Sequence, residues 1–186
     1  HDASKDAYTL HVVMQGVTTM RRHLSAYTGV PEDRLNFEVR DIGGGFGQRT
    51  PAYPEYCALM IAARGTGKPV KWVCERSEHF LADSHGRANI STARLAVDDQ
   101  GRFLALELDI VADMGAYLSA YAPYIPWLGV GMATGPYDIP IAHVRLRSVY
   151  TNTVPVDAYR GAGRPEASYL IERAVGDRAF PAAVVE

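Results

Sequence analysis

Strand-like and helix-like segments follow one another along this chain without strict alternation. Apolar and polar residues alternate over 35–42, as in a half-buried strand, whereas Met20, Leu24 and Tyr27 are spaced four and three residues apart, as on one helix face. A mixed order of this kind predicts an α+β or mixed α/β fold, in which helices pack on a mixed sheet. The predicted strands are 8–14, 35–42, 69–74, 88–97, 103–112 and 144–150, and the predicted helices are 17–27, 54–63 and 165–175.

The composition is that of an ordinary globular protein. The chain has 186 residues, of which 47% are hydrophobic and 22% are charged, so it can bury a core and we expect one domain over 1–186. The net charge of −2 gives no electrostatic reason for binding nucleic acid or an anionic membrane. The uncharged segment 114–133 contains two prolines and several glycines, which favour irregular core over a membrane span. The N-terminal residues lack the features of a signal peptide, so we expect a cytoplasmic protein.

A glycine-rich loop, GGGFGQR at 43–49, lies between a predicted strand and a predicted helix. Four glycines in five positions allow positive φ angles and close approach of a ligand to the backbone, and Arg49 adds positive charge. The loop is not a Walker motif, and its spacing does not match the dinucleotide fingerprint. A connector that binds nothing is the simpler alternative.

A second glycine-rich segment, AYRGAGRPE at 158–166, opens the last predicted helix. Its two arginines and the helix N-terminus would suit an anion, although an ordinary helix entry with solvated arginines would look the same. Together the two loops suggest a large polyanionic ligand held from two sides. On the residues alone, an anion- or nucleotide-binding module satisfies this pattern.

Other reactive residues give little signal. The six histidines are scattered, the two cysteines form no CxxC pair, and no GxSxG nucleophile motif is present. Gln15 ends the first predicted strand, where a lone glutamine is usually a turn residue.

Three motifs resemble the large subunit of molybdenum hydroxylases, the family of xanthine dehydrogenases, aldehyde oxidases and carbon monoxide dehydrogenases. They are GGGFGQR, ADMGAY at 112–117 and AYRGAGRPEA, and they occur in the family's order. RSE at 76–78 and HGR at 85–87 also resemble the segment between them. The resemblance runs from about Tyr8 to Arg173 and is closest to the carbon-monoxide-dehydrogenase-like group.

The resemblance implies a role for each matching residue. Gln15 would hydrogen-bond an oxygen ligand of molybdenum and is the expected catalytic residue. No protein side chain would ligate the metal. The expected cofactor-binding residues are Gly44, Gly45, Phe46 and Gly47 beside the metal and the pterin, and Arg160 and Gly161 on the opposite side.

The resemblance also implies an oxidoreductase activity. The family hydroxylates a carbon of an aldehyde or N-heterocycle with water as the oxygen source, using molybdenum-molybdopterin, including its cytosine dinucleotide form. Electrons would leave through iron–sulfur clusters to FAD on partner subunits. The expected partners are therefore the remaining large-subunit domains, an FAD subunit, an iron–sulfur subunit and a small-molecule substrate.

Several positions depart from particular members of the family. Gly161 stands where the copper-containing carbon monoxide dehydrogenases carry a cysteine, which disfavours carbon monoxide oxidation. Leu128 and Thr50 stand where the purine enzymes have an arginine and a glutamate, which disfavours xanthine. The family's catalytic base is a glutamate expected beyond residue 186, and Glu166 does not match its position.

A family large subunit is several hundred residues long, so we expect this chain to be its first cofactor-binding portion and to be inactive alone. The resemblance ends within 175–186, where Pro181 would break a helix. We expect the apolar segment 117–130 either to form an exposed surface that later domains of the large subunit cover, or to fold inward as core. A catalytically silent domain that keeps the fold without the cofactor is the alternative function.

Overall fold

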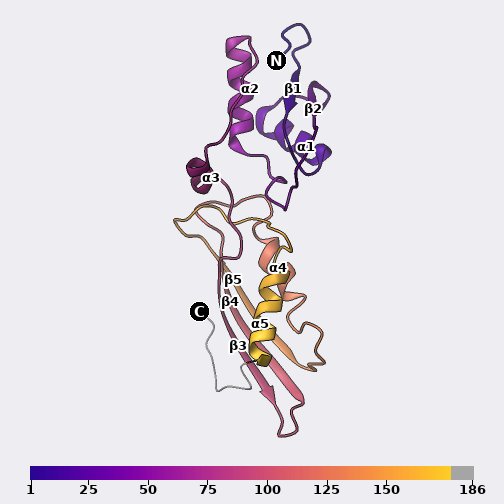
Figure 1. Cartoon of the computed structure of the whole chain (residues 1–186), viewed down its shortest axis with the longest axis vertical. Coiled ribbons are helices and arrows are strands. Elements are labelled where there is room, and N and C mark those ends of the chain that lie inside the picture. Colours follow the sequence, from indigo (N-terminus) through magenta and orange to yellow (C-terminus); the bar gives the residue numbers. More distant parts are fainter. Residues whose placement is uncertain (177–186) are drawn as a thin grey trace. The chain divides into compact units, whose positions relative to one another are not determined.

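The computed structural model describes residues 1–176, and these fall into two compact units that divide after Ala82 (Figure 1). Each unit is described below by itself. Within the described residues, none of the helices is both long enough and apolar enough to cross a membrane.

The first unit is built on a pair of parallel strands, β1 (Tyr8–His11) and β2 (Leu35–Glu38), in which Tyr8 lies opposite Leu35. The other elements of this unit are α1 (Val17–Thr28), the 3-10 helix η1 (Glu32–Arg34), α2 (Pro54–Thr66) and α3 (Arg76–Ala82). A right-handed connection through a helix is the usual way to join two parallel strands, and here α1 lies within it.

The core of the first unit gathers one face of α1 against the strand pair and α2. Met20 and Leu24 are fully buried, as the predicted helix face requires, whereas Tyr27 is 61% exposed. Tyr8 and Leu35 from the strands and Met60 from α2 complete this cluster. Gly16 and Gly29, both with positive φ, bound α1 at its two ends.

The second unit contains a three-stranded mixed sheet and two helices. Its elements are β3 (Asn89–Val97), β4 (Phe103–Asp113), α4 (Tyr124–Val130), β5 (Ala142–Val149) and α5 (Arg164–Gly176). The central strand β4 pairs with β3 antiparallel and with β5 parallel. The β3–β4 hairpin closes through a turn at 98–101, with the sequence DDQG, where the Asp98 carboxylate accepts hydrogen bonds from the Gln100 and Arg102 amides.

Alternate residues of β4 form the core of the second unit. Leu106, Leu108 and Ile110 are buried and pack with Leu170 and Ile171 of α5, which lies along the sheet (Figure 1). Five helices and a mixed sheet confirm the predicted fold class.

Several sequence predictions are wrong within the described residues. Strands β1 and β2 end at His11 and Glu38, short of the predicted ends at 14 and 42, because the pairing of the two strands stops there. Residues 69–74 form no strand, because no described segment pairs with them and Val70, Trp72 and Val73 remain 39–70% exposed. Helix α4 lies in the segment 114–133 that was expected to be irregular, and α3 was not predicted either. The predicted helix break at Pro181 lies outside the described residues.

Candidate functional site

Gln15, which lies four residues after the end of β1, is hydrogen-bonded to the first glycine-rich loop. The Gly47 amide donates a hydrogen bond to Gln15 Oε1 at 2.7 Å, and the Gln15 amide donates to the Arg49 carbonyl at 2.9 Å. The structure therefore brings together Gln15 and the loop, two features that are separate in the sequence. Because a backbone N–H can only donate, this contact assigns the oxygen of the Gln15 carboxamide to Gly47 and leaves Nε2 as its donor end.

The lack of side chains at Gly44 and Gly45 is what makes this packing possible. A Cβ added at Gly45 would overlap with the side chain of Gln15, and one at Gly44 would overlap with the Phe46 ring. Gly44 thus makes room for a side chain of the same loop, and Gly45 makes room for Gln15. This use of the glycines differs from the close ligand approach expected from the sequence.

The backbone of this loop lies largely in the left-handed region. Gly44 and Gly47 have φ of +106° and +97°, and Phe46, which is 49% exposed, has φ of +56°. A bulky residue with positive φ is uncommon and marks a loop whose shape is fixed by its surroundings. The Thr50 amide donates to the Gly47 carbonyl at 3.0 Å and closes the turn toward α2.

The second glycine-rich loop leads into α5. Gly161, Ala162 and Gly163 have φ of +95°, +47° and +89°, and the Ala162 amide donates to the Tyr159 carbonyl at 2.8 Å. A Cβ at Gly163 would overlap with the Ile125 carbonyl oxygen of α4. Gly163 therefore allows α4 and α5 to pack closely, and the second glycine-rich loop lies next to this helix contact.

Asp157, a residue that the sequence analysis did not single out, anchors the segment before this loop. It is 1% exposed, and its carboxylate accepts hydrogen bonds from the Ser119 hydroxyl and from the Tyr121 and Ala158 amides. Its position between apolar neighbours in VPVDAY is the sequence signal for a buried, hydrogen-bonded carboxylate.

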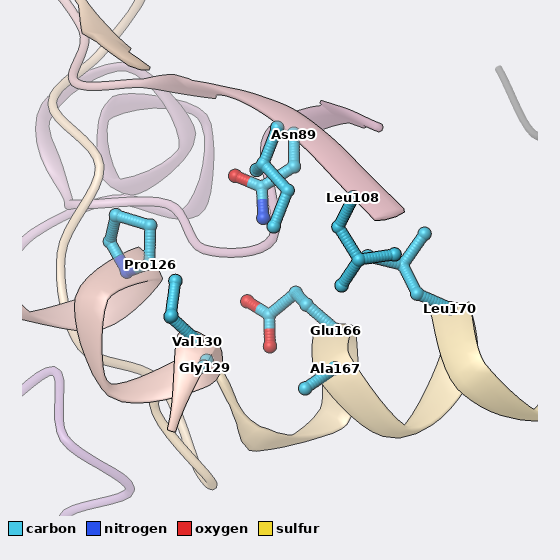
Figure 2. A pocket seen from close by; sticks show the side chains of 10 residues that line it. Asn89, Leu108, Pro126, Gly129, Val130, Glu166, Ala167 and Leu170 are labelled. Carbon is cyan, nitrogen blue, oxygen red and sulfur yellow. The ribbon is translucent and has the colours of Figure 1, made fainter. Parts of the chain in front are cut away.

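Glu166 points into a small pocket between α4, α5 and the sheet (Figure 2). Leu108 and Leu170 line the apolar side of this pocket, and Asn89 contributes an amide. Glu166 Oε2 is buried and receives no hydrogen bond within the described part of the chain. The carboxyl group is therefore directed into the interior of the second unit.

The two loops belong to different units. Gln15 and Gly44–Gly47 lie in the first unit, and Arg160 and Gly161 in the second. That both loops hold one ligand from two sides stays a prediction. Among residues 1–176, no three histidine, cysteine, aspartate or glutamate side chains are grouped as metal ligands would be.

The chain is similar to known proteins in both sequence and structure. Residues 1–181 match the family model described as "Molybdopterin cofactor-binding domain". The chain is 37% identical over 177 residues to the carbon monoxide dehydrogenase large chain of Hydrogenophaga pseudoflava, covering 94% of this chain and 22% of that protein. It is 35% identical over 153 residues to the 6-hydroxypseudooxynicotine dehydrogenase complex subunit gamma of Paenarthrobacter nicotinovorans, covering 82% of this chain and 19% of the relative.

Solved structures agree with the sequence relatives. The crystal structure of quinoline 2-oxidoreductase from Pseudomonas putida 86 superimposes with a TM-score of 0.87 at 31% identity, over 93% of this chain and 22% of that one. The chain thus spans about a fifth of the length of the proteins it matches. The chain belongs to the molybdopterin cofactor-binding domain family, and the proteins it matches include the large chain of carbon monoxide dehydrogenase and the crystal structure of a Cu,Mo-CO dehydrogenase.

Proposed function

We propose that the chain is the molybdenum-cofactor-binding portion of an oxidoreductase that hydroxylates a carbon of an aldehyde or N-heterocycle with oxygen from water. The contact between Gln15 Oε1 and the Gly47 amide supports this most directly. It holds the carboxamide oxygen at the loop and leaves the NH2 group as the donor that would serve a ligand oxygen. The orientation of a carboxamide held in this way is set before the ligand binds.

The proposed cofactor contacts divide between the two loops. Backbone groups of Gly44, Gly45, Phe46 and Gly47 would lie beside the pterin and the metal, and Arg160 and Gly161 would contact the cofactor from the other side. When bound, the cofactor supplies the two-electron oxidation of the carbon, and the protein supplies binding and orientation. The guanidinium of Arg160 would suit a phosphate of the pterin nucleotide, including the cytosine dinucleotide form.

An N-heterocycle is the substrate class that we favour. Relatives of this chain include proteins named nicotine 6-hydroxylase large subunit and quinoline 2-oxidoreductase. Gly161 supplies no thiolate where the resemblance places the cysteine of the copper-containing enzymes, so carbon monoxide is disfavoured. Leu128 likewise supplies no charge for a purine, so xanthine is disfavoured.

The proposed activity requires further protein. We propose partner subunits that carry FAD and iron–sulfur clusters, and a catalytic base in a part of the large subunit outside this chain. The 6-hydroxypseudooxynicotine relative is named as one subunit of a complex, which supports such an assembly. By itself, residues 1–186 should show no hydroxylase activity.

Replacing Gln15 in the assembled enzyme tests the proposal. Gln15→Ala removes one hydrogen bond near the reacting oxygen, worth about 1–3 kcal/mol, and should slow turnover roughly tenfold to hundredfold at equal molybdenum content. Gln100→Ala, in the β3–β4 turn of the second unit, is the control and should behave as wild type. A kcat equal to that of wild type at full molybdenum occupancy would show that Gln15 does not have this role.

Elemental analysis distinguishes a chain that binds the molybdenum cofactor from a catalytically silent domain that does not. The purified assembly should contain molybdenum and a pterin released on denaturation. An assembly that contains neither would support the catalytically silent alternative and reject the proposal, whatever its stability.

A further inference from the structure

The HGR segment at 85–87, which the proposed function does not use, runs beside the approach to the second loop. The His85 amide donates to the Pro155 carbonyl at 2.9 Å, and the Asp157 amide donates to the His85 carbonyl at 2.8 Å. These two bonds form a parallel bridge between His85 and Val156. The segment is thus fixed against the residues that lead to Arg160.

Each of the next two residues makes a contact with the start of the loop. At Gly86, an added Cβ would lie 3.1 Å from Cβ of Tyr159, so a glycine allows the two segments to approach closely. The guanidinium of Arg87 lies over the Tyr159 ring, 5.3 Å from its centroid, and donates a hydrogen bond to the carbonyl oxygen of Arg160. A planar guanidinium can make both contacts at once, because it stacks with its face and donates with its edge.

The backbone of Arg87 is itself unusual. Its φ is +63°, a left-handed conformation that residues other than glycine rarely adopt. Such a conformation persists only where the surrounding contacts determine it. The side chain of Arg87 is exposed and packs in neither hydrophobic cluster of the second unit. Its contacts with Tyr159 and Arg160 are therefore the ones that account for the conformation of its backbone.

The loop that follows Arg160 has anchors of its own: the Arg164 amide and guanidinium donate to the Gly161 carbonyl, and the Ala162 amide donates to the Tyr159 carbonyl. Gly161, Ala162 and Gly163 all have positive φ, and glycines at two of these positions give the backbone wide freedom. A hydrogen bond to the Arg160 carbonyl fixes the peptide plane from which the Gly161 N–H projects. We propose that Arg87 is a positioning residue that holds the Arg160–Gly161 peptide in the orientation needed to contact the cofactor; this rests on the proposed function.

The test uses the full-length assembled protein with three substitutions. Arg87→Gly removes the guanidinium but suits the positive φ, so the backbone should keep its course. Arg87→Lys keeps a donor for the carbonyl but loses the planar stacking group. Arg94→Met is the control, since Arg94 is an exposed arginine of the same unit that pairs with Glu107 on the hairpin.

Amide exchange at Ala162 and molybdenum content are the readouts. A lost hydrogen bond of ordinary strength corresponds to a roughly threefold to tenfold change in an equilibrium, so exchange at Ala162 should accelerate by about that factor in Arg87→Gly. Molybdenum retained after dialysis should fall severalfold, while the thermal unfolding midpoint stays near that of wild type. Arg87→Lys should lie between these values, and Arg94→Met should match wild type.

The outcomes separate this inference from the proposed function. Unchanged exchange at Ala162, or faster exchange with full molybdenum retention, would overturn the role of Arg87. Loss of molybdenum only together with a large fall in the unfolding midpoint would show a structural role instead. A wild-type assembly that contains no molybdenum would overturn the proposed function, and the exchange measurement would still report whether Arg87 holds the loop.

Discussion

At the scale of single residues, the absence of a side chain does much of the positioning. Gly45 leaves the space that the Gln15 side chain occupies, and Gly163 leaves the space in which α4 meets α5. Gly115, with φ of +73°, lies against the backbone at Val154 and Pro155, where a Cβ would overlap. In each case a methyl group would displace backbone or a functional side chain.

Gly45→Ala should therefore displace Gln15 without unfolding the first unit. The added Cβ would overlap with the Gln15 side chain, so the Gly47 amide should lose its acceptor and exchange faster with solvent. Gly45→Val should cost the assembled enzyme most of its molybdenum as well. Exchange at Gly47 and elemental analysis measure the two effects.

Gly65→Ala is the matched control for this substitution. Gly65 lies inside α2 with open space around its Cβ position, so alanine should stabilise the helix by about 0.5–1 kcal/mol. Wild-type exchange at Gly47 in Gly45→Ala would contradict the proposed packing.

At the scale of elements, Asp113 ties the end of β4 to the segment after β5. Its carboxylate accepts hydrogen bonds from the Gly115 amide at 2.7 Å and from the Thr151 and Thr153 hydroxyls at 2.7 Å and 3.1 Å. Burial raises the pKa of this carboxyl, but these donors outweigh burial and hold the pKa below its usual range. The ADMGAY motif thus has a structural use, since it organises the segment that continues to Asp157 and Arg160.

The lowered pKa of Asp113 predicts a pH-dependent contribution to stability. A carboxylate with a depressed pKa in the folded state stabilises the protein above its unfolded-state pKa, near 3.9, and loses this contribution as the pH falls through the folded-state pKa. The difference in unfolding free energy between wild type and Asp113→Asn should therefore be largest near pH 6 and shrink toward pH 3. A difference that stays constant over this range would show that the charge of Asp113 does not contribute.

The sequence predicted helices and strands correctly where the residues of the segment itself determine the local structure. The spacing of Met20 and Leu24 identified the buried face of α1, and the predicted strands 88–97 and 103–112 correspond to β3 and β4. The 69–74 segment has the composition of a strand, but a strand forms only where a partner pairs with it. Helix α4 was missed because Pro126 and Gly129 are poor helix formers, although burial of Ile125, Pro126 and Gly129 secures this short helix.

The candidate site was predictable only in part. The glycine loops were found from their motifs and Gln15 from the family resemblance, whereas the hydrogen bond between Gln15 and Gly47 joins residues 32 apart in sequence and required the fold. Arg87 and Asp157 act through backbone groups of the second loop, and no spacing rule identifies such long-range contacts.

At the scale of the molecule, an apolar strip remains exposed on the second unit. The strip consists of Tyr117, Leu118, Tyr124, Trp127 and Leu128, whose exposed fractions range from 37% to 63%. Ala122 and Ile125 of the same segment are buried, so the segment contributes to the core and also leaves aromatic side chains outside. Because the matched relatives are about five times longer, we expect other parts of a large subunit to cover this strip.

Trp127→Glu should reduce self-association of residues 1–186 without loss of stability. Trp127 is 63% exposed, so a charge there is solvated, and the unfolding free energy should change by no more than about 0.5 kcal/mol. Ile61→Glu, at a 73% exposed position on α2, is the control outside the strip. Light scattering and binding of an apolar dye measure the effect, and a wild-type chain that stays monomeric and binds no dye would contradict the expectation.

The mixed pairing of β4 also determines an order of events during folding. Strands β3 and β4 are joined by a tight turn, so their hairpin can form within roughly 1–10 μs, whereas β5 must return across residues 114–141 before it can pair. Closing that longer connection costs more chain entropy and postpones the parallel half of the sheet. During refolding, pulse-labelled amides of β3 should be protected before those of β5, and simultaneous protection of both strands would show that the sheet forms in a single step.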